Sequence, residues 1–596
     1  MPGPHNRGRA PEKSKDFKGA WRKLLRLCRG YLPAICIALV CAVGGTVLTL
    51  LGPEQLKKLT NVITEGILTG IDLNAVSDIG ALLVCFYAAS MLLSSVQSWT
   101  LTTVTQRVAR KMRADISAKI NRLPMAYFNR TSTGDILSRV TNDVDTIGQS
   151  LKNSFGALVS SVVQMLGALV MMLLNDAAMT GTAIGATVLG FGLMFFIMSR
   201  SQKYFLRQQR SLGSLNGHIE EIYSGHTVVK AYNGERAARE EFNKRNEALR
   251  VNGFKAQCLS GLMPPLMGFI GNLGYVAVCV VGATLVIRGR IEFGVIVAFM
   301  MYIRLFTQPL NQIAQAMQSM QSAAAAGERV FEFLEAEELS DEHDVPRRLE
   351  HPQGRVEFDH VRFGYEDSDR IVIKDFSAVA QPGQKVAIVG PTGAGKTTMV
   401  NLLMRFHELK GGEIRIDGVP TSQMSRAEIH DLFCMVLQDT WLFEGTLREN
   451  LMYNTTGKTD EDMRRACKAV GLDHFVRTQP KGYDTVLNDR VSLSQGEKQQ
   501  LTIARAMIAD KPMLILDEAT SSVDTRTELK IQRAMDELMR TRTSFVIAHR
   551  LSTIKDADLI LVMRDGDIVE SGTHEALLRQ GGFYAELYNS QFEQAG

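Results

Sequence analysis

Six long apolar runs within the first 310 residues constrain the fold of this chain more than any other feature. Each run is long enough to cross a bilayer as a helix, because about 20 apolar residues span the hydrocarbon core. One such run could be a buried helix of a soluble protein, but six in succession predict a membrane domain. The runs cover residues 33–51, 79–101, 155–174, 177–198, 262–287 and 293–310.

The charges around these runs predict the orientation of the chain. Residues 1–30 carry nine Lys and Arg, and the loops 102–154 and 199–261 carry many more. The loops 52–78 and 288–292 together hold only four. Since positive charge stays on the cytoplasmic side, we expect both termini and the two long loops in the cytoplasm. We expect the membrane to be the plasma membrane.

The sixth run contains one charged residue, Arg304, whereas the first five contain none. A charge inside a span is costly and usually has a partner or a role. Arg304 is therefore a candidate contact for an anionic headgroup or a Gln and Asn network, or it snorkels towards the cytoplasmic face. The spans also hold methionines and polar residues that suit a cavity for varied amphipathic molecules, although such residues more often pack or face lipid.

The predicted organisation has four parts. Residues 1–32 form a cytoplasmic tail and an interfacial helix whose apolar face includes Trp21 and Leu24. Residues 33–322 form the membrane domain, 323–354 a linker and 355–596 a nucleotide-binding domain. Turn residues at 128–139 and 213–217 predict the tips of the two long loops, where a cytoplasmic domain would be contacted.

A glycine-rich loop between a predicted strand and a predicted helix marks the nucleotide site. The apolar run 386–389 predicts a buried strand, and 399–406 predicts a helix. Glycines in such a loop let backbone N–H groups surround phosphates, Lys396 supplies a positive charge, and the Thr397 hydroxyl ligates Mg²⁺. The predicted contacts to ATP here are Gly390, Pro391, Thr392, Gly393, Ala394, Gly395, Lys396, Thr397 and Thr398.

The catalytic candidates follow other predicted strands. Asp517 ends the apolar run 513–516, where it would hold Mg²⁺, and Glu518 would accept a proton from the attacking water. His549 follows the apolar run 544–548 and is predicted to contact the γ-phosphate; the alternative is a core histidine. Gln438 follows the apolar run 435–437 and is predicted to contact Mg²⁺ and water. Tyr365 ends a predicted strand and could stack on adenine or simply pack.

These motifs together resemble the exporter branch of the ATP-binding cassette family, in which six spans are fused to one nucleotide-binding domain. The resemblance covers roughly residues 18–590 and includes the segments 493–497 and 521–524 in family order. It implies that Ser494 and Gly496 contact the γ-phosphate bound to a second subunit, and that Asp524 belongs to the nucleotide site. It also implies a dimer, because the family works with two nucleotide domains and twelve spans.

The signature segment departs from the family pattern. The usual sequence is Leu-Ser-Gly-Gly-Gln, whereas this chain has Gln495 and Glu497 at the third and fifth positions. Glu518 is nevertheless present. This combination resembles one subunit of heterodimeric multidrug-type exporters, in which the two ATP sites are unequal. We expect a heterodimer in preference to a homodimer with a tolerated variant signature.

Composition excludes several other classes of protein. The net charge of +4 gives no reason to expect a nucleic-acid partner, and the eight cysteines contain no pair with the spacing of a zinc site. The predicted fold is a six-helix membrane domain fused to a cytoplasmic α/β ATPase domain. The predicted function is ATP-driven export of amphipathic small molecules, with ATP and Mg²⁺. The alternatives are a lipid flippase and an ATP-gated sensor, and the intact Glu518 argues against the sensor.

Overall fold

The structure is a computed structural model that describes residues 16–342, 344–365, 370–438, 440–488, 493–517, 525–547 and 554–592. It divides into two compact units. The first comprises Met1–Arg122 and Thr131–Ala336, and the second comprises Leu123–Arg130 and Glu337–Gly596. The short helix α4 (Met125–Arg130) therefore groups with the C-terminal unit, although it lies between two helices of the first unit in the sequence.

Helices build the described part of the first unit. They are α1 (Phe17–Cys28), α2 (Leu32–Thr69), α3 (Leu73–Ile120), α5 (Thr133–Ser138), α6 (Val144–Asn175), α7 (Ala177–Ser224), α8 (His226–Ala231), α9 (Glu235–Gly261), α10 (Met263–Ile287) and α11 (Phe293–Leu334). A π-helical turn, Arg139–Asp143, joins α5 to α6. Six described helical segments are long and apolar enough to cross a membrane, one for each apolar run, so the prediction of six spans is confirmed.

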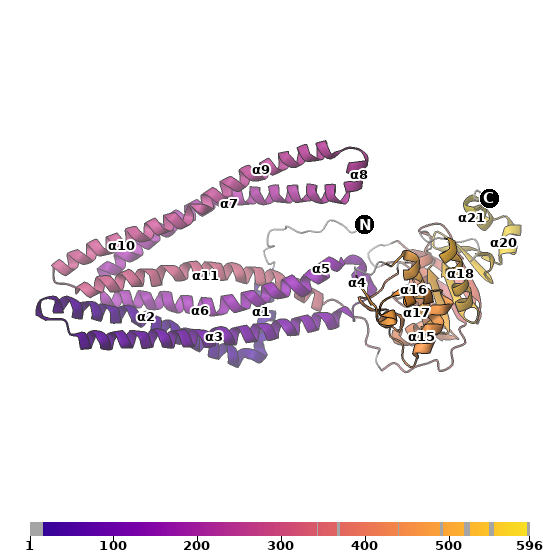
Figure 1. The fold of residues 1–596 in the computed structure, drawn as a ribbon, viewed down its shortest axis with the longest axis horizontal. Helices are drawn as coiled ribbons and strands as arrows, with labels where there is room; N and C mark the ends of the chain where they lie inside the picture. The colour runs from indigo at the N-terminus through magenta and orange to yellow at the C-terminus, as the bar shows by residue number, and fades with distance from the viewer. Residues whose placement is uncertain are drawn as a thin grey trace. The chain divides into compact units, whose positions relative to one another are not determined.

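Several spans continue far beyond the bilayer. Helices α3 and α7 each contain 48 residues. At 1.5 Å per residue each is about 72 Å long, more than twice the roughly 30 Å of the hydrocarbon core. Helices α7 and α9 lie side by side along much of this length (Figure 1). The segments that flank these spans are therefore regular helix and not irregular loops.

The predicted turn at 213–217 is wrong. Helix α7 runs through it to Ser224, and the chain turns instead around α8, with Asn233 at a φ of 53°. A glycine inside a helix costs only about 1 kcal/mol, which packing can offset. Contacts with α9 hold this part of α7: the Asn252 side-chain amide donates to the Ser211 hydroxyl at 3.0 Å, and Arg245 donates to the Ser214 carbonyl at 3.0 Å.

Two kinds of contact hold the first unit together. An apolar core between α6, α7, α10 and α11 includes the fully buried Met172, Phe299 and Tyr302. Further along the same helices, a buried Asp143 accepts hydrogen bonds from the Arg329 guanidinium, at 2.9 Å from its Nε. Losing Arg329 would leave the Asp143 carboxylate buried without this cation, so the pair ties α11 to the start of α6.

Helix α1 packs on this bundle through one face. The Trp21 indole N–H donates to the Met320 carbonyl of α11 at 3.3 Å, and its ring meets Phe155 of α6 edge-on at 5.7 Å. Leu24 is fully buried, whereas Leu25 is 48 % exposed. The apolar face of the predicted interfacial helix is thus divided between protein contacts and a side that is free to meet lipid.

The described C-terminal unit is built around a ten-stranded mixed sheet in the order β5-β4-β1-β2-β12-β11-β3-β10-β9-β6. The strands are β1 (Val356–Phe363), β2 (Ile373–Ala380), β3 (Lys385–Val389), β4 (Gly411–Ile416), β5 (Val419–Pro420), β6 (Phe433–Val436), β9 (Met513–Asp517), β10 (Thr543–Ile547), β11 (Leu559–Arg564) and β12 (Asp567–Gly572). A small second sheet pairs β7 (Gly445–Thr446) with β8 (Val486–Leu487).

The other described helices of this unit lie around the sheet and beside it (Figure 1). They are α12 (Lys396–Leu403), α13 (Arg426–Leu432), α14 (Leu447–Leu451), α15 (Asp460–Ala469), α16 (Asp473–Thr478), α17 (Gln495–Ala509), α18 (Thr525–Met539), α20 (His574–Gln580) and α21 (Phe583–Phe592). Alternate residues of β3 enter different cores: Val386 and Ile388 join one cluster, and Ala387 and Val389 join another. Burial on both faces explains why β3, β9 and β10 are continuous apolar runs.

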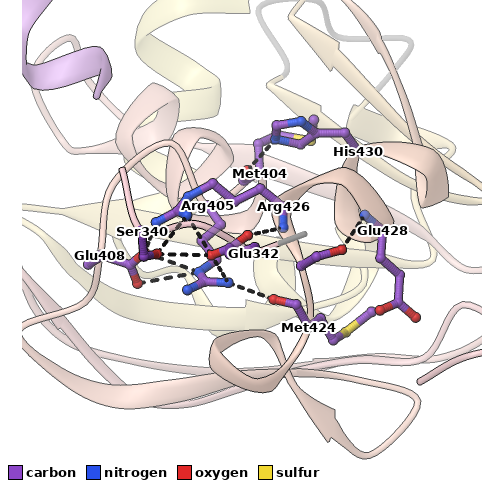
Figure 2. Close-up of polar contacts among 10 residues, drawn as sticks. Ser340, Glu342, Met404, Arg405, Glu408, Met424, Arg426, Glu428 and His430 are labelled. Atoms are coloured by element: carbon purple, nitrogen blue, oxygen red, sulfur yellow. Dashed lines mark hydrogen bonds and ion pairs between the residues drawn. The ribbon is translucent and has the colours of Figure 1, made fainter. Parts of the chain in front are cut away.

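Acidic side chains fasten the segment before β1 to this unit. The Glu342 carboxylate accepts a hydrogen bond from the Arg426 backbone N–H at 2.6 Å and pairs with Arg405 at 3.2 Å (Figure 2). The Glu428 carboxylate accepts the backbone N–H groups of Arg348 and Leu349, both at 2.8 Å. Residue 342 and residues 348–349 are therefore held in place on the second unit.

Candidate functional site

The phosphate loop follows β3 in a conformation that requires its glycines. Gly390, Gly393 and Gly395 have φ angles of 154°, 85° and 103°, a region that other residues rarely adopt. A Cβ on Gly390 would lie 2.3 Å from the Met563 carbonyl oxygen. Between them, Pro391, Thr392 and Gly393 are exposed and Ala394 is buried. The loop can thus turn its backbone N–H groups towards an anion at the start of α12.

Lys396 is the first residue of α12 and is buried at 7 % exposure. Its ammonium donates to the carbonyl oxygens of Gly390 at 2.7 Å and Pro391 at 3.1 Å, so the side chain lies back over its own loop. Burial lowers the pKa of this amine, and the nearby Asp517 carboxylate opposes the shift. A charge held among loop carbonyls is well placed to exchange these contacts for phosphate oxygens.

Parallel strands bring the other candidates to the edge that carries the phosphate loop. Strand β10 lies between β3 and β9, and its Ile547 is paired with Ile388 on one side and Asp517 on the other. Strand β6, which ends just before the exposed Gln438, is the next strand beyond β9. Because carboxyl ends of parallel strands meet at one sheet edge, the phosphate loop, Asp517 and Gln438 share that edge.

Three of the predicted site residues, Glu518, His549 and Asp524, lie outside the described residues. Glu518 directly follows Asp517 in the sequence, and His549 comes two residues after Ile547. Their assignment therefore depends on their position in the chain after β9 and β10.

Tyr365 lies beside the phosphate loop. Its hydroxyl is 3.2 Å from the hydroxyl of the buried Thr398, in the first turn of α12. The ring is half-buried and meets His407 edge-on, with centroids 5.4 Å apart. The Thr397 hydroxyl belongs to an exposed side chain at the start of the same helix. Tyr365 is thus tied to the helix that would bind the phosphates.

The signature segment forms the N-terminus of α17. Ser494 is the N-cap, and Glu497 completes a capping box with it. The Glu497 carboxylate accepts the Ser494 backbone N–H and hydroxyl, each at 2.8 Å. Ser494 is exposed and Gly496 is buried. The hydroxyl that the family resemblance assigns to a γ-phosphate is therefore occupied by a carboxylate of its own helix.

A separate cavity lies in the first unit, between α7, α10 and α11. Its volume is about 420 Å³, within the range of roughly 300–1,000 Å³ that is usual for small-ligand sites. Arg304, Gln308 and Asn311 line it from α11, and Asn272 and Tyr275 line it from α10. Arg304 is already a candidate from the sequence, whereas the wall that α7 supplies is found only in the structure.

Comparison with known proteins identifies the family. Residues 35–310 match the family model of the ABC transporter transmembrane region, and residues 373–521 match the ABC transporter model. This chain belongs to the ABC transporter family. It is an exporter-type member, with its membrane domain and its ATP-hydrolysing domain in one polypeptide.

Several relatives match most of this ABC transporter. The fatty acid ABC transporter ATP-binding/permease protein of Mycobacterium tuberculosis is 48 % identical over 519 residues, 87 % of this chain and 82 % of that protein. The ATP-dependent lipid A-core flippase of Syntrophus aciditrophicus is 30 % identical over 595 residues, 99 % of this chain and 98 % of the flippase. A bacterial Atm1-family ABC exporter solved with ATP bound has a TM-score of 0.71 and 27 % identity, covering 95 % of this chain and 98 % of that exporter.

Two features of this ABC transporter escape the sequence analysis. The hydrogen bond between Tyr365 and Thr398 joins residues 33 positions apart, and no local pattern marks it. The α7 wall of the cavity could have been found from a sequence pattern. Ala183, Ala186, Thr187 and Gly190 are small residues with i, i+3, i+4 and i+7 spacing, which places them on one helix face.

Proposed function

We propose that this chain is one half of a dimeric pump that exports amphipathic, lipid-like molecules by alternating access driven by ATP. The cavity between α7, α10 and α11 supports this proposal most directly, because it combines an apolar wall with a polar one. The names of two relatives, a fatty acid transporter and a lipid A-core flippase, favour lipid-like substrates over a multidrug range. Export needs only that ATP and substrate bind the alternating states unequally.

In this proposal the ATP site works with the residues at the shared sheet edge. The loop from Gly390 to Thr397 and the Lys396 ammonium bind the phosphates, and Glu518 accepts a proton from the attacking water. His549 contacts the γ-phosphate, and Tyr365 lies against the adenine. Glu518 and His549 are assigned by their positions in the sequence, just after β9 and β10. These two strands end at the sheet edge that carries the phosphate loop.

The residues present suit Mg²⁺. The exposed Thr397 hydroxyl, the Asp517 carboxylate and the exposed Gln438 amide are oxygen donors, which Mg²⁺ prefers. A single carboxylate also fits, because Mg²⁺ at ATP sites is held by one or two carboxylates together with the phosphates. Bound there, Mg²⁺ would neutralise phosphate charge, and Thr397, Asp517 and Gln438 would hold it.

The identity of the second subunit determines which ATP site the signature segment of this chain faces. In a heterodimer a partner with the standard signature completes the site at Lys396 and Glu518, as the variant residues Gln495 and Glu497 suggest. In a homodimer the capping box of Ser494 and Glu497 faces ATP at both sites. We propose a plasma-membrane location with both termini in the cytoplasm, which the distribution of Lys and Arg supports.

The first experiment measures Mg-ATPase activity of this chain, expressed without any partner, in lipid nanodiscs. Glu518→Gln is the control for contaminating ATPases. Activity that the variant abolishes identifies a working homodimer. A folded chain that binds ATP and does not hydrolyse it requires a different subunit with the standard signature.

The transport test uses proteoliposomes with matched sets of long-chain lipids and cationic drugs. ATP-dependent movement of a lipid-like molecule, lost in Glu518→Gln, supports the proposal. Movement of drugs alone would restore the multidrug alternative, and vigorous ATP hydrolysis without movement of any amphiphile would refute export.

A further inference from the structure

We propose that Arg304 and the polar side chains beside it bind the oxyanion headgroup, a carboxylate or phosphate, of the exported amphiphile. This inference rests on the proposed export function and names the substrate class of its cavity. It assigns opposite walls to opposite ends of the substrate, with the headgroup on α11 and α10 and the hydrocarbon chain along α7.

Arg304 lies deep in its span. Helix α11 starts at Phe293, so Arg304 is 11 residues along it. At 1.5 Å per residue this is about 17 Å, roughly midway through a hydrocarbon core of about 30 Å. A cation at this depth faces a bundle interior or a cavity rather than lipid, and it calls for an anionic partner.

The described residues supply no such partner. Arg304 is exposed to the cavity, and its guanidinium pairs with no carboxylate in the part of the chain that the structure describes. Two cations near the outer ends of the spans differ: Lys57 pairs with Glu54 at 2.6 Å, and Arg290 lies 3.7 Å from Asp176. The anion for Arg304 must therefore come from outside the described chain, and a substrate headgroup meets that requirement.

The neighbours of Arg304 can complete an oxyanion site. Gln308 and Asn311 follow it at i+4 and i+7, so all three lie on one face of α11. Asn272 of α10 lines the same cavity, and none of these amides bonds to another described residue. Thr307 differs, since its hydroxyl donates to the Ile303 carbonyl of its own helix at 2.9 Å. Amide donors beside a guanidinium suit the several oxygens of a carboxylate or phosphate.

The opposite wall suits a hydrocarbon chain. Ala183, Ala186 and Phe191 of α7 present apolar side chains to the cavity, and Gly190 adds bare backbone to this wall. Gly190 also lets α10 come close, because a Cβ there would lie 2.7 Å from a methyl carbon of Ile270. Among the described residues that line the cavity, none is acidic. A cationic amphiphile would therefore meet an unbalanced guanidinium, and a neutral one would leave it unpaired.

The test compares four amphiphiles with the same 16-carbon chain: hexadecanoate, hexadecyl phosphate, hexadecanol and hexadecylamine. The full-length transporter, reconstituted with whichever partner restores its ATPase, is assayed for ATP-dependent transport and for the concentration that half-stimulates ATPase. The variants are Arg304→Gln, Arg304→Lys and the matched control Arg288→Gln, which removes an arginine that does not line the cavity. Basal ATPase, which needs no cavity residue, reports that each variant is folded.

We expect the half-stimulating concentration of one or both anions to be about 10- to 100-fold lower than that of hexadecanol in the wild type, as hydrogen bonds to a charged group imply. The anion preference is the ratio of these two concentrations. Arg304→Gln should reduce this ratio to near one, Arg304→Lys should keep part of it, and Arg288→Gln should keep all of it. The half-stimulating concentrations of hexadecanoate and hexadecyl phosphate then show which oxyanion the site prefers.

Retention of the full anion preference in Arg304→Gln would overturn this inference, as would equal transport of all four amphiphiles by the wild type. Both results leave the export function intact. Failure to transport any of the four by an active ATPase instead refutes the export of lipid-like molecules itself, so the two failures are distinguishable.

Discussion

The carboxylate of Glu342 accepts hydrogen bonds from both the backbone N–H and the guanidinium of Arg426 (Figure 2). Both side chains are only 15 % exposed, and Glu342 also pairs with Arg405. Glu342 comes from an acidic stretch that the sequence analysis assigns to a linker, yet here it is a fixed point of the C-terminal unit. Its loss would leave the guanidinium groups of two mostly buried arginines, Arg405 and Arg426, without this anion.

We expect Glu342→Gln to loosen residues 340–342 and 344–349. Losing a charged acceptor for two donors costs about 2 kcal/mol, which corresponds to roughly 30-fold faster opening. Hydrogen–deuterium exchange of peptides covering this segment measures the change directly. Glu350→Gln, at an exposed carboxylate nearby, is the control and should leave exchange unchanged. Equal exchange in both variants would mean that Glu342 does not hold the segment.

We expect Glu518→Gln to lower ATPase activity by about 10²- to 10⁴-fold, the usual contribution of a general base. ATP binding should remain, because Lys396 and the phosphate loop are untouched. Measuring turnover and nucleotide affinity separately checks this. Near-normal turnover would remove Glu518 from the catalytic role.

Glu497→Gln tests the variant signature. Glutamine preserves the capping box, because it can also accept the Ser494 backbone N–H, but it removes a negative charge from the place where the resemblance sets a γ-phosphate. We expect ATP to bind about fivefold more tightly at the site that this segment faces, from roughly 1 kcal/mol of relieved repulsion. A titration with a non-hydrolysable ATP analogue measures the effect. An unchanged affinity would indicate that Glu497 does not lie near bound nucleotide.

Tyr365 gives a prediction in two substitutions. Tyr365→Ala removes the ring and should raise the ATP concentration for half-maximal activity by about 10-fold, as the loss of base stacking implies. Tyr365→Phe removes only the hydroxyl that meets Thr398 and should change it by less than about threefold, since a neutral hydrogen bond contributes little net free energy. If both variants behave alike, the hydroxyl rather than the ring matters, and stacking is wrong.

The elements that could be predicted are those whose signal is local and periodic. Six apolar runs give six spans, and continuous apolar runs give β3, β9 and β10. The phosphate loop is evident because its conformation admits only glycine at Gly390 and Gly395. These features depend on neighbouring residues alone.

The elements that could not be predicted depend on contacts between distant residues. The turn signal at 213–217 fails because packing against α9 outweighs two glycines in α7. The pairing of Glu342 with Arg426 spans 84 positions, and that of Asp143 with Arg329 spans 186. Three helices together form the cavity, so the sequence marks Arg304 as a costly charge in a span but does not show which residues surround it.

Helix α11 can bend at an interior proline. It contains Pro309 in its interior, where the missing N–H weakens the helix and favours bending. From Pro309 to its end at Leu334 is about 38 Å, and from Pro309 back to Arg304 is about 8 Å. A bend at Pro309 would let the longer arm swing while the short arm that carries Arg304 stays in the membrane bundle. Movement of the far end of α11 would then be uncoupled from Arg304, so this hinge would allow the C-terminal half of the helix to shift while the arginine keeps its place in the cavity.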